Sequence, residues 1–294
     1  MLRIDCAQAA ERIEAFIRER CRTLGRAGAI LGMSGGLDSS TAAALCARSL
    51  GREKVVGLLM PEKEGRSSDT ADAAMVARHL GIRTKTHDLS EALGAMGLYG
   101  SALSKLPSRS LRGVVARFGR RLLSNRLSDN PLAASLGGTA PQLVARSLAH
   151  CRAKHRMRAV ALYLHAELEN LMVVGCANHT ERMTGLFVRF GVDQCADIMP
   201  LGRLYRTQVL QLAEYLGLPQ HILQKPPDPG IIPGVDDKYR CLIGLDSKTL
   251  DIVLEALDRG QAASDIARET GLAPCDVAHV QRLAALSEHM RGLA

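Results

Sequence analysis

The chain has 294 residues, of which 47% are hydrophobic and 3% aromatic, with no tryptophan and a formal net charge of +8. This length allows one large domain, or a domain with an appendage, and aliphatic side chains suffice to fill its core. No run of about 18 uncharged apolar residues occurs and no apolar leader begins the chain, so we expect neither a membrane span nor a signal peptide.

Eight cysteines lie at wide spacings, and no two of them form a Cys-x-x-Cys pair. In a chain of this length, that pattern is typical of free, mostly buried thiols and not of a zinc site or a disulfide framework. We therefore expect a protein of the reducing cytoplasm.

The first ninety residues alternate between helical and strand patterns. Residues 54–60 contain four consecutive or near-consecutive branched apolar side chains, which is typical of a strand buried on both faces. The alternation predicts an α/β fold with a doubly wound parallel sheet. The helices are predicted over residues 5–24, 39–50 and 68–80, and the strands over 29–33, 54–60 and 83–88.

A glycine-rich turn separates the first predicted strand from the helix that follows. It reads Ser-Gly-Gly-Leu-Asp-Ser over residues 34–39 and offers backbone amides and hydroxyl groups at a helix N-terminus, where an anion is stabilised. Asp38 would repel bare phosphate but would hold a Mg²⁺ ion that bridges to it. No Gly-Lys-Ser/Thr follows, so the turn is not a Walker motif. It resembles the pyrophosphate loop (PP-loop) of N-type ATP pyrophosphatases, and an ordinary β–α turn is the alternative.

The segment 94–150 breaks the alternation and carries most of the positive charge. Between residues 97 and 150, eight basic residues face the single acid Asp129, which gives +7 of the total +8. The segment is predicted to be a basic insertion, helical or mobile. Its charge suits an anionic partner such as a dinucleotide, a nucleic acid or an acidic membrane, or else a solvated helical face.

Regular structure resumes at residue 153, and the last fifty residues read as a small helical appendage. A pattern within 263–274 resembles a helix-turn-helix but carries few basic side chains, so packing is favoured over nucleic-acid binding. We predict one domain over 1–245 and the appendage over 246–294. The predicted elements are helices over 153–169, 181–190, 207–216, 247–257, 263–270 and 275–289, and a strand over 171–175.

A second polar cluster, at residues 175–181, directly follows the strand predicted over 171–175. Ligands in open parallel sheets collect beyond the carboxyl ends of the strands, where the glycine-rich turn also opens. Glu181 is therefore predicted to join Asp38 as a second Mg²⁺ ligand, since two carboxylates and phosphate oxygens suit octahedral Mg²⁺. The alternative is an acid in the first turn of a helix.

Several motifs in a fixed order make the chain similar to the ammonia-dependent NAD synthetase family of the PP-loop superfamily. The resemblance covers nearly the whole chain outside 94–150. Its motifs are Ser34–Ser39, Gly175 with Asn178 and Glu181, Thr184–Phe187, Phe190-Gly191, Ala196–Ile198, Pro200-Leu201, Leu204–Gln208, Lys225–Pro227, Pro233-Gly234 and Ser287–Arg291.

The resemblance implies a Rossmann-like fold of the adenine nucleotide alpha hydrolase type and an amide-forming ligase. Such an enzyme adenylates the carboxylate of deamido-NAD with ATP and Mg²⁺, and ammonia then displaces AMP to give NAD. Catalytic roles are implied for Asp38, Ser34 and Ser39, and Mg²⁺ ligation for Asp38 and Glu181. Contacts to deamido-NAD are implied for Lys154, Arg189, Asp197 and His289. Contacts to ATP are implied for Gly32, Met33, Ser34, Gly35, Gly36, Leu37, Asp38, Ser39, Cys176, Arg206 and Asp228.

The chain departs from the family pattern mainly on the acyl-acceptor side. On that side, Lys154 stands for Arg, Arg189 and Met290 stand for Lys, and the Gly-Asp-Gly-Gly run of the family becomes Gly191–Gln194, one residue longer. Among the implied ATP contacts, Cys176 stands for Thr, Arg206 for Lys, and Asp228 for Ser or Thr. An amide ligase of another carboxylate therefore stays open, as do an RNA-modifying adenylase and an ATP sensor without turnover.

The resemblance also implies a homodimer. Because few residues precede the glycine-rich turn, free ammonia or ammonia from a separate glutaminase is the expected nitrogen donor. Neither a membrane nor a nucleic acid is an expected partner.

Overall fold

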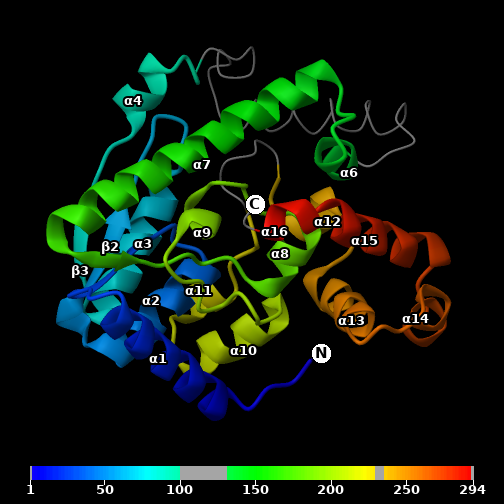
Figure 1. The fold of residues 1–294 in the computed structure, drawn as a ribbon, viewed down its shortest axis with the longest axis horizontal. Coiled ribbons are helices and arrows are strands. Elements are labelled where there is room, and N and C mark those ends of the chain that lie inside the picture. The colour runs from blue at the N-terminus through cyan, green and yellow to red at the C-terminus, as the bar shows by residue number, and fades with distance from the viewer. Residues whose placement is uncertain (1, 100–130, 229–234, 293–294) are drawn as a thin grey trace.

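A computed structural model describes residues 2–99, 131–228 and 235–292 (Figure 1). Its centre is a parallel sheet of four strands: β1 (Gly28–Gly32), β2 (Val55–Leu59), β3 (Arg83–Thr86) and β4 (Leu171–Val173). Their spatial order is β3-β2-β1-β4. The sheet therefore extends from β1 to β2 and β3 on one side, and β4 pairs with β1 on the other side. Ile30 pairs with Val56 on one side and with Val173 on the other.

Helices cover both faces of the sheet, which confirms the doubly wound architecture. Because side chains alternate along a strand, Ala29 and Leu31 face one layer and Ile30 faces the other. The first layer contains α1 (Cys6–Thr23), α2 (Leu37–Leu50), α3 (Ser67–Leu80) and α10 (Arg206–Tyr215). The second contains α4 (Ser90–Ala95) and the long helix α7 (Gln142–Glu169), which runs diagonally across the view in Figure 1.

A second hydrophobic core lies among the C-terminal helices. It is formed by α13 (Ser247–Asp258), α14 (Ala263–Thr270) and α15 (Pro274–Leu286), with α6 (Pro131–Leu136) beside them. Tyr205 and Tyr239 from outside the segment 246–294 are buried in the same core. The domain division at residue 246 stays a prediction. The other short helices are η1 (Arg52–Lys54), α8 (His179–Thr184), α9 (Val192–Cys195), α11 (Gln220–Leu223), α12 (Lys238–Leu242) and α16 (Glu288–Arg291).

Three predicted helices have wrong boundaries. The helix expected over 181–190 ends at Thr184, because Gly185 adopts a left-handed conformation with φ +73° and closes α8. The helix expected from residue 153 begins at Gln142, inside the segment predicted as an insertion. The helix expected over 275–289 divides at Ser287 into α15 and α16.

Most of the basic segment lies outside the described residues, namely Lys105 to Asp129. All eight cysteines lie within them and all are free thiols, as expected. The prediction that most of them are buried is wrong, since only Cys21 and Cys46 are buried. Among the helices that the structure describes, none has the length and apolarity needed to traverse a bilayer.

Candidate active site

The glycine-rich turn follows β1 and leads directly into α2. Gly35 has φ +69°, and a Cβ atom there would lie 2.4 Å from the carbonyl oxygen of Asp69, so this position requires glycine. The Ser34 and Ser39 hydroxyl oxygens lie 3.0 Å apart, and Ser39 Oγ accepts a hydrogen bond from the Ser34 amide. Gly36 caps α2 without a side-chain hydrogen bond. The N-terminus of α2 is therefore free of side-chain capping, as an anion site requires.

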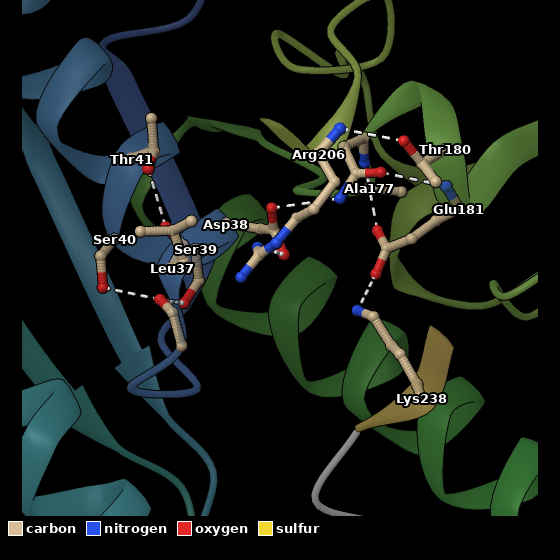
Figure 2. Close-up of polar contacts among 12 residues, drawn as sticks. Leu37, Asp38, Ser39, Ser40, Thr41, Ala177, Thr180, Glu181, Arg206 and Lys238 are labelled. Atoms are coloured by element: carbon tan, nitrogen blue, oxygen red, sulfur yellow. Dashed lines mark hydrogen bonds and ion pairs between the residues drawn. The ribbon is translucent and has the colours of Figure 1, made fainter. Parts of the chain in front are cut away.

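Asp38 and Glu181, which are remote in the sequence, lie in one polar cluster (Figure 2). Asn178 donates hydrogen bonds to both of them. The Asn178 side-chain amide donates to Asp38 Oδ1 at 3.1 Å, and the Asn178 backbone N–H donates to Glu181 Oε2 at 3.1 Å. Asn178 also caps α8, accepting from the Glu181 amide in a capping box. The two carboxylates thus lie on either side of one asparagine at the carboxyl edge of the sheet.

Two cations complete this cluster, one beside each carboxylate. Arg206 Nη1 lies 2.7 Å from Asp38 Oδ2, and Lys238 Nζ forms an ion pair with Glu181 Oε1. Burial acts to raise the pKa of Asp38, but Arg206 and Lys238 outweigh it and hold that pKa below its ordinary value. Burial raises the pKa of Glu181, against the opposing effect of Lys238.

Asp193 supports the chain segment behind the cluster. Its Oδ1 accepts from the backbone amides of Cys176 at 2.7 Å and Ala177 at 2.9 Å. Burial raises the pKa of the Cys176 thiol well above its ordinary value, and nearby Asp193 adds to the shift. Cys176 is therefore a neutral thiol beside the two carboxylates.

Lys225 joins the glycine-rich turn to α3. Its Nζ lies 3.0 Å from the Gly35 carbonyl oxygen, 2.9 Å from Asp69 and 2.6 Å from Asp72. A few residues further on, Asp228 forms an ion pair with Arg66. The segment 225–228 is thus held beside the turn by both ends, and the Asp228 carboxylate is neutralised by Arg66.

Two residues that were predicted to contact deamido-NAD, Lys154 and Asp197, form contacts with other groups of the protein. Lys154 Nζ lies 2.8 Å from both Glu62 Oε2 and Glu64 Oε2, with its side chain 6% exposed. Asp197 accepts from the Val173 amide at 2.7 Å and from the Tyr163 hydroxyl at 3.1 Å.

The other two lie nearer the surface. The Arg189 carbonyl accepts from the Arg156 guanidinium of α7, and the Arg189 guanidinium lies over the Phe190 ring at 4.9 Å. His289 is exposed on α16, which Gln194 links to α9 by donating to the Met290 carbonyl at 2.8 Å.

Sequence reasoning did not assign a role to Asn178, Asp193 or Lys238. Asn178 stood in a motif with Glu181, and its position directly before a helix is the usual signal for a cap. Asp193 stood in the Gly191–Gln194 run without a role of its own. No pattern in the sequence marks Lys238, because its contacts depend on how distant loops fold together.

The described residues contain no group of three or more His, Cys, Asp or Glu side chains placed to hold a metal ion. A divalent cation between Asp38 and Glu181 would therefore need further oxygen ligands from a nucleotide or from water.

A doubly wound parallel sheet, with a glycine-rich turn and paired carboxylates at its carboxyl edge, defines a nucleotide-binding α/β enzyme. The family model described as NAD synthase matches residues 9–109 and 124–294. The NH(3)-dependent NAD(+) synthetase of Thermotoga maritima is 34% identical over 284 residues, covering 96% of each chain. That of Coprothermobacter proteolyticus is 33% identical over 270 residues, covering 91% of this chain and 89% of the relative. The chain belongs to the NAD synthase family, whose members are ligases that form carbon–nitrogen bonds.

Solved structures support the fold. The NMN synthetase of Francisella tularensis superposes with a TM-score of 0.72 at 23% identity, covering 99% of this chain and 98% of that one. The NH3-dependent NAD synthetase of Campylobacter jejuni gives 0.69 at 21% identity with the same coverage.

Proposed function

We propose that the protein is an ammonia-dependent NAD synthetase that uses ATP to amidate deamido-NAD. The observation that carries the proposal is the pairing of Asp38 and Glu181 through Asn178, beside an uncapped helix N-terminus, in a chain of this family. The substrate carboxylate attacks Pα of ATP and the Pα–O–Pβ bond breaks, releasing pyrophosphate. Ammonia then attacks the acyl carbon, AMP leaves, and the nitrogen loses a proton to give the amide.

The residues around the turn suit the first step, in which charge builds up on phosphate oxygens. That charge can be stabilised by backbone amides at the start of α2, by the hydroxyls of Ser34 and Ser39, and by the Arg206 guanidinium once it leaves Asp38. The proposed ATP contacts are Gly32, Met33, Ser34, Gly35, Gly36, Leu37, Asp38, Ser39, Cys176, Arg206 and Asp228.

The donor set at Asp38 and Glu181 fits Mg²⁺ in kind, since both residues offer the carboxylate oxygens that this ion prefers. When bound there, Mg²⁺ would neutralise charge on the phosphate oxygens. Asp38→Asn is expected to abolish Mg²⁺-dependent pyrophosphate release while the fold stays intact.

The residues proposed to contact the carboxylate substrate allow a second candidate function, that of an amide ligase for a different carboxylate. Lys154 is committed to Glu62 and Glu64, so it would have to leave two carboxylates in order to contact a dinucleotide. Contacts of Lys154, Arg189, Asp197 and His289 with deamido-NAD are accordingly proposals. The structural neighbour titled NMN synthetase makes the corresponding mononucleotide the natural competitor.

The test is a substrate comparison. Purified protein is given ATP, Mg²⁺, ammonium and either deamido-NAD or nicotinic acid mononucleotide, and the amide products are measured by mass together with pyrophosphate. We expect NAD to form with the higher kcat/KM. Faster amidation of the mononucleotide would support the second candidate, and no AMP with either substrate would contradict both. Protein bearing Asp38→Asn serves as the control for a contaminating ligase.

We further propose that the enzyme is a homodimer, works in the cytoplasm, and takes free ammonia or ammonia from a separate glutaminase. A stripe on α7 supports the dimer: Val160, Leu164 and Leu168 are 62%, 49% and 72% exposed, and Phe190 beside them is 51% exposed. A pocket of about 570 Å³ lies among Val160, Leu164 and Phe190. Contiguous exposed apolar side chains of this kind mark protein contact sites.

A further inference from the structure

The strongest unexplained feature of the site is the way its carboxylate oxygens are occupied. Each of the four oxygens of Asp38 and Glu181 already accepts from a protein donor. Asn178 donates to Asp38 Oδ1 and Glu181 Oε2. Arg206 donates to Asp38 Oδ2, and Lys238 donates to Glu181 Oε1 (Figure 2). A divalent cation that binds both carboxylates must therefore compete with two resident cations.

Hydrogen bonds of the surrounding backbone hold Lys238 in this position. It opens α12, where Asp237 caps the helix by accepting from the Tyr239 and Arg240 amides. The Lys238 amide donates to the Pro227 carbonyl at 3.1 Å, and its Nζ lies 5.3 Å from the centre of the Tyr239 ring. Its side chain is 12% exposed, and that of Glu181 10%. The backbone of Lys238 is thus fixed beside the site, and its side chain is partly desolvated.

We propose that Lys238 occupies the place of the metal at Glu181 in the nucleotide-free enzyme and thereby couples metal binding to triphosphate binding. The inference rests on the proposed function. A metal ion alone has to displace Lys238 from Glu181 and Arg206 from Asp38, so it binds weakly. A triphosphate alone finds both cations engaged by carboxylates. When the two arrive together, the metal takes the carboxylates and the displaced cations pair with phosphate oxygens, so each ligand raises the affinity for the other.

The test measures binding of Mn²⁺ by electron paramagnetic resonance, with and without an ATP analogue that has a methylene bridge between Pα and Pβ. In the wild-type protein, the analogue is expected to tighten Mn²⁺ binding about tenfold or more. In Lys238→Gln, Mn²⁺ alone is expected to bind about tenfold more tightly than in the wild type, because a competing charge is gone. The analogue is expected to increase the Mn²⁺ affinity of Lys238→Gln correspondingly less than it increases that of the wild type.

Two matched variants isolate the charge at this position. Lys248→Gln removes an exposed lysine at the start of α13 and is expected to leave both affinities unchanged. Lys238→Arg keeps the charge and is expected to retain the coupling. Since Lys238→Gln leaves Glu181 unpaired, its melting temperature without ligand is measured too, and Mn²⁺ is expected to raise it more than it raises that of the wild type.

The possible outcomes distinguish a failure of the Lys238 proposal from a failure of the proposed NAD synthetase function. If the wild type shows coupling but Lys238→Gln has the same Mn²⁺ affinity and the same coupling, the inference is overturned and the proposed function stands. If the wild type binds neither Mn²⁺ nor the analogue, the proposed function fails as well.

Discussion

At the scale of single residues, Cys176 is a departure from the family pattern that lies beside the carboxylate cluster. Burial keeps its thiol protonated, and a thiol is a weaker hydrogen-bond donor than the threonine hydroxyl that the family resemblance implies at this position. Cys176→Thr is therefore expected to leave kcat/KM for ATP equal or to raise it, by up to about tenfold, in a pyrophosphate-release assay. A large loss of activity would instead show that the thiol has a role of its own in this chain.

The residues of the site were predictable to different degrees. Asp38, Glu181 and the glycine-rich turn follow buried strands, and the common carboxyl edge of parallel strands brings them together. The partners of these carboxylates were not predictable. Arg206 and Lys238 reach them from loops and helix starts with no periodic relation to the strands. Likewise, nothing in the sequence showed that Lys154 meets Glu62 and Glu64.

At the scale of secondary-structure elements, Asp251 of α13 connects three helices. It is fully buried and accepts from the Thr180 hydroxyl of α8 at 2.6 Å and from the Thr207 amide of α10 at 2.7 Å. Asp251→Ala leaves both donors without a partner, and is expected to lower the free energy of unfolding by about 2–4 kcal/mol. Chemical denaturation measures this. Glu269→Ala, at an exposed site on α14, is the control and should change little.

The contact of α7 with the loop after β2 predicts a dependence of stability on pH. Burial acts to raise the pKa of Glu62, but hydrogen bonding and charge from Lys154 outweigh it, so the folded-state pKa lies below its ordinary value of 4.5. A depressed pKa contributes stability that is present above pH 4.5 and is lost as the pH falls through the folded-state value.

Glu62→Gln is thus expected to unfold more easily at neutral pH and to lose less stability on acidification than the wild type. Denaturation curves at a series of pH values between neutrality and acid measure both effects. Glu11→Gln, at an exposed position on α1, should give a curve parallel to that of the wild type. A parallel curve for Glu62→Gln would contradict the account.

The elements themselves were largely predictable from local patterns. β2, β3 and β4 fall inside the predicted ranges, and β1 begins one residue before its range. In β1, β2 and β4 the signal is a short apolar run between turns. Helix ends were less predictable. The apolar pattern beyond Thr184 continues, and only the left-handed Gly185 ends α8. The start of α7 at Gln142 carries no side-chain cap that would have marked it.

At the scale of the whole molecule, α7, which carries the apolar stripe, lies on the opposite side of the sheet from α1 (Figure 1). If it is the dimer contact, Leu164→Glu places a charge in that contact and is expected to give a monomer, because an unpaired buried charge is costly. Sedimentation at several protein concentrations measures the mass. Leu24→Glu, at the end of α1, makes the same change away from the stripe and should leave the mass unchanged. An unchanged mass for Leu164→Glu would place the contact elsewhere.

The central claim is that the substrate carboxylate is activated by attack on Pα of ATP. The most direct measurement uses deamido-NAD labelled with ¹⁸O in its carboxylate, with ATP, Mg²⁺ and ammonium, followed by mass analysis of every product. The account predicts unlabelled pyrophosphate, AMP that carries one ¹⁸O atom from the carboxylate, and NAD that retains the other ¹⁸O atom in its amide. Label in inorganic phosphate, with ADP as the nucleotide product, would contradict it.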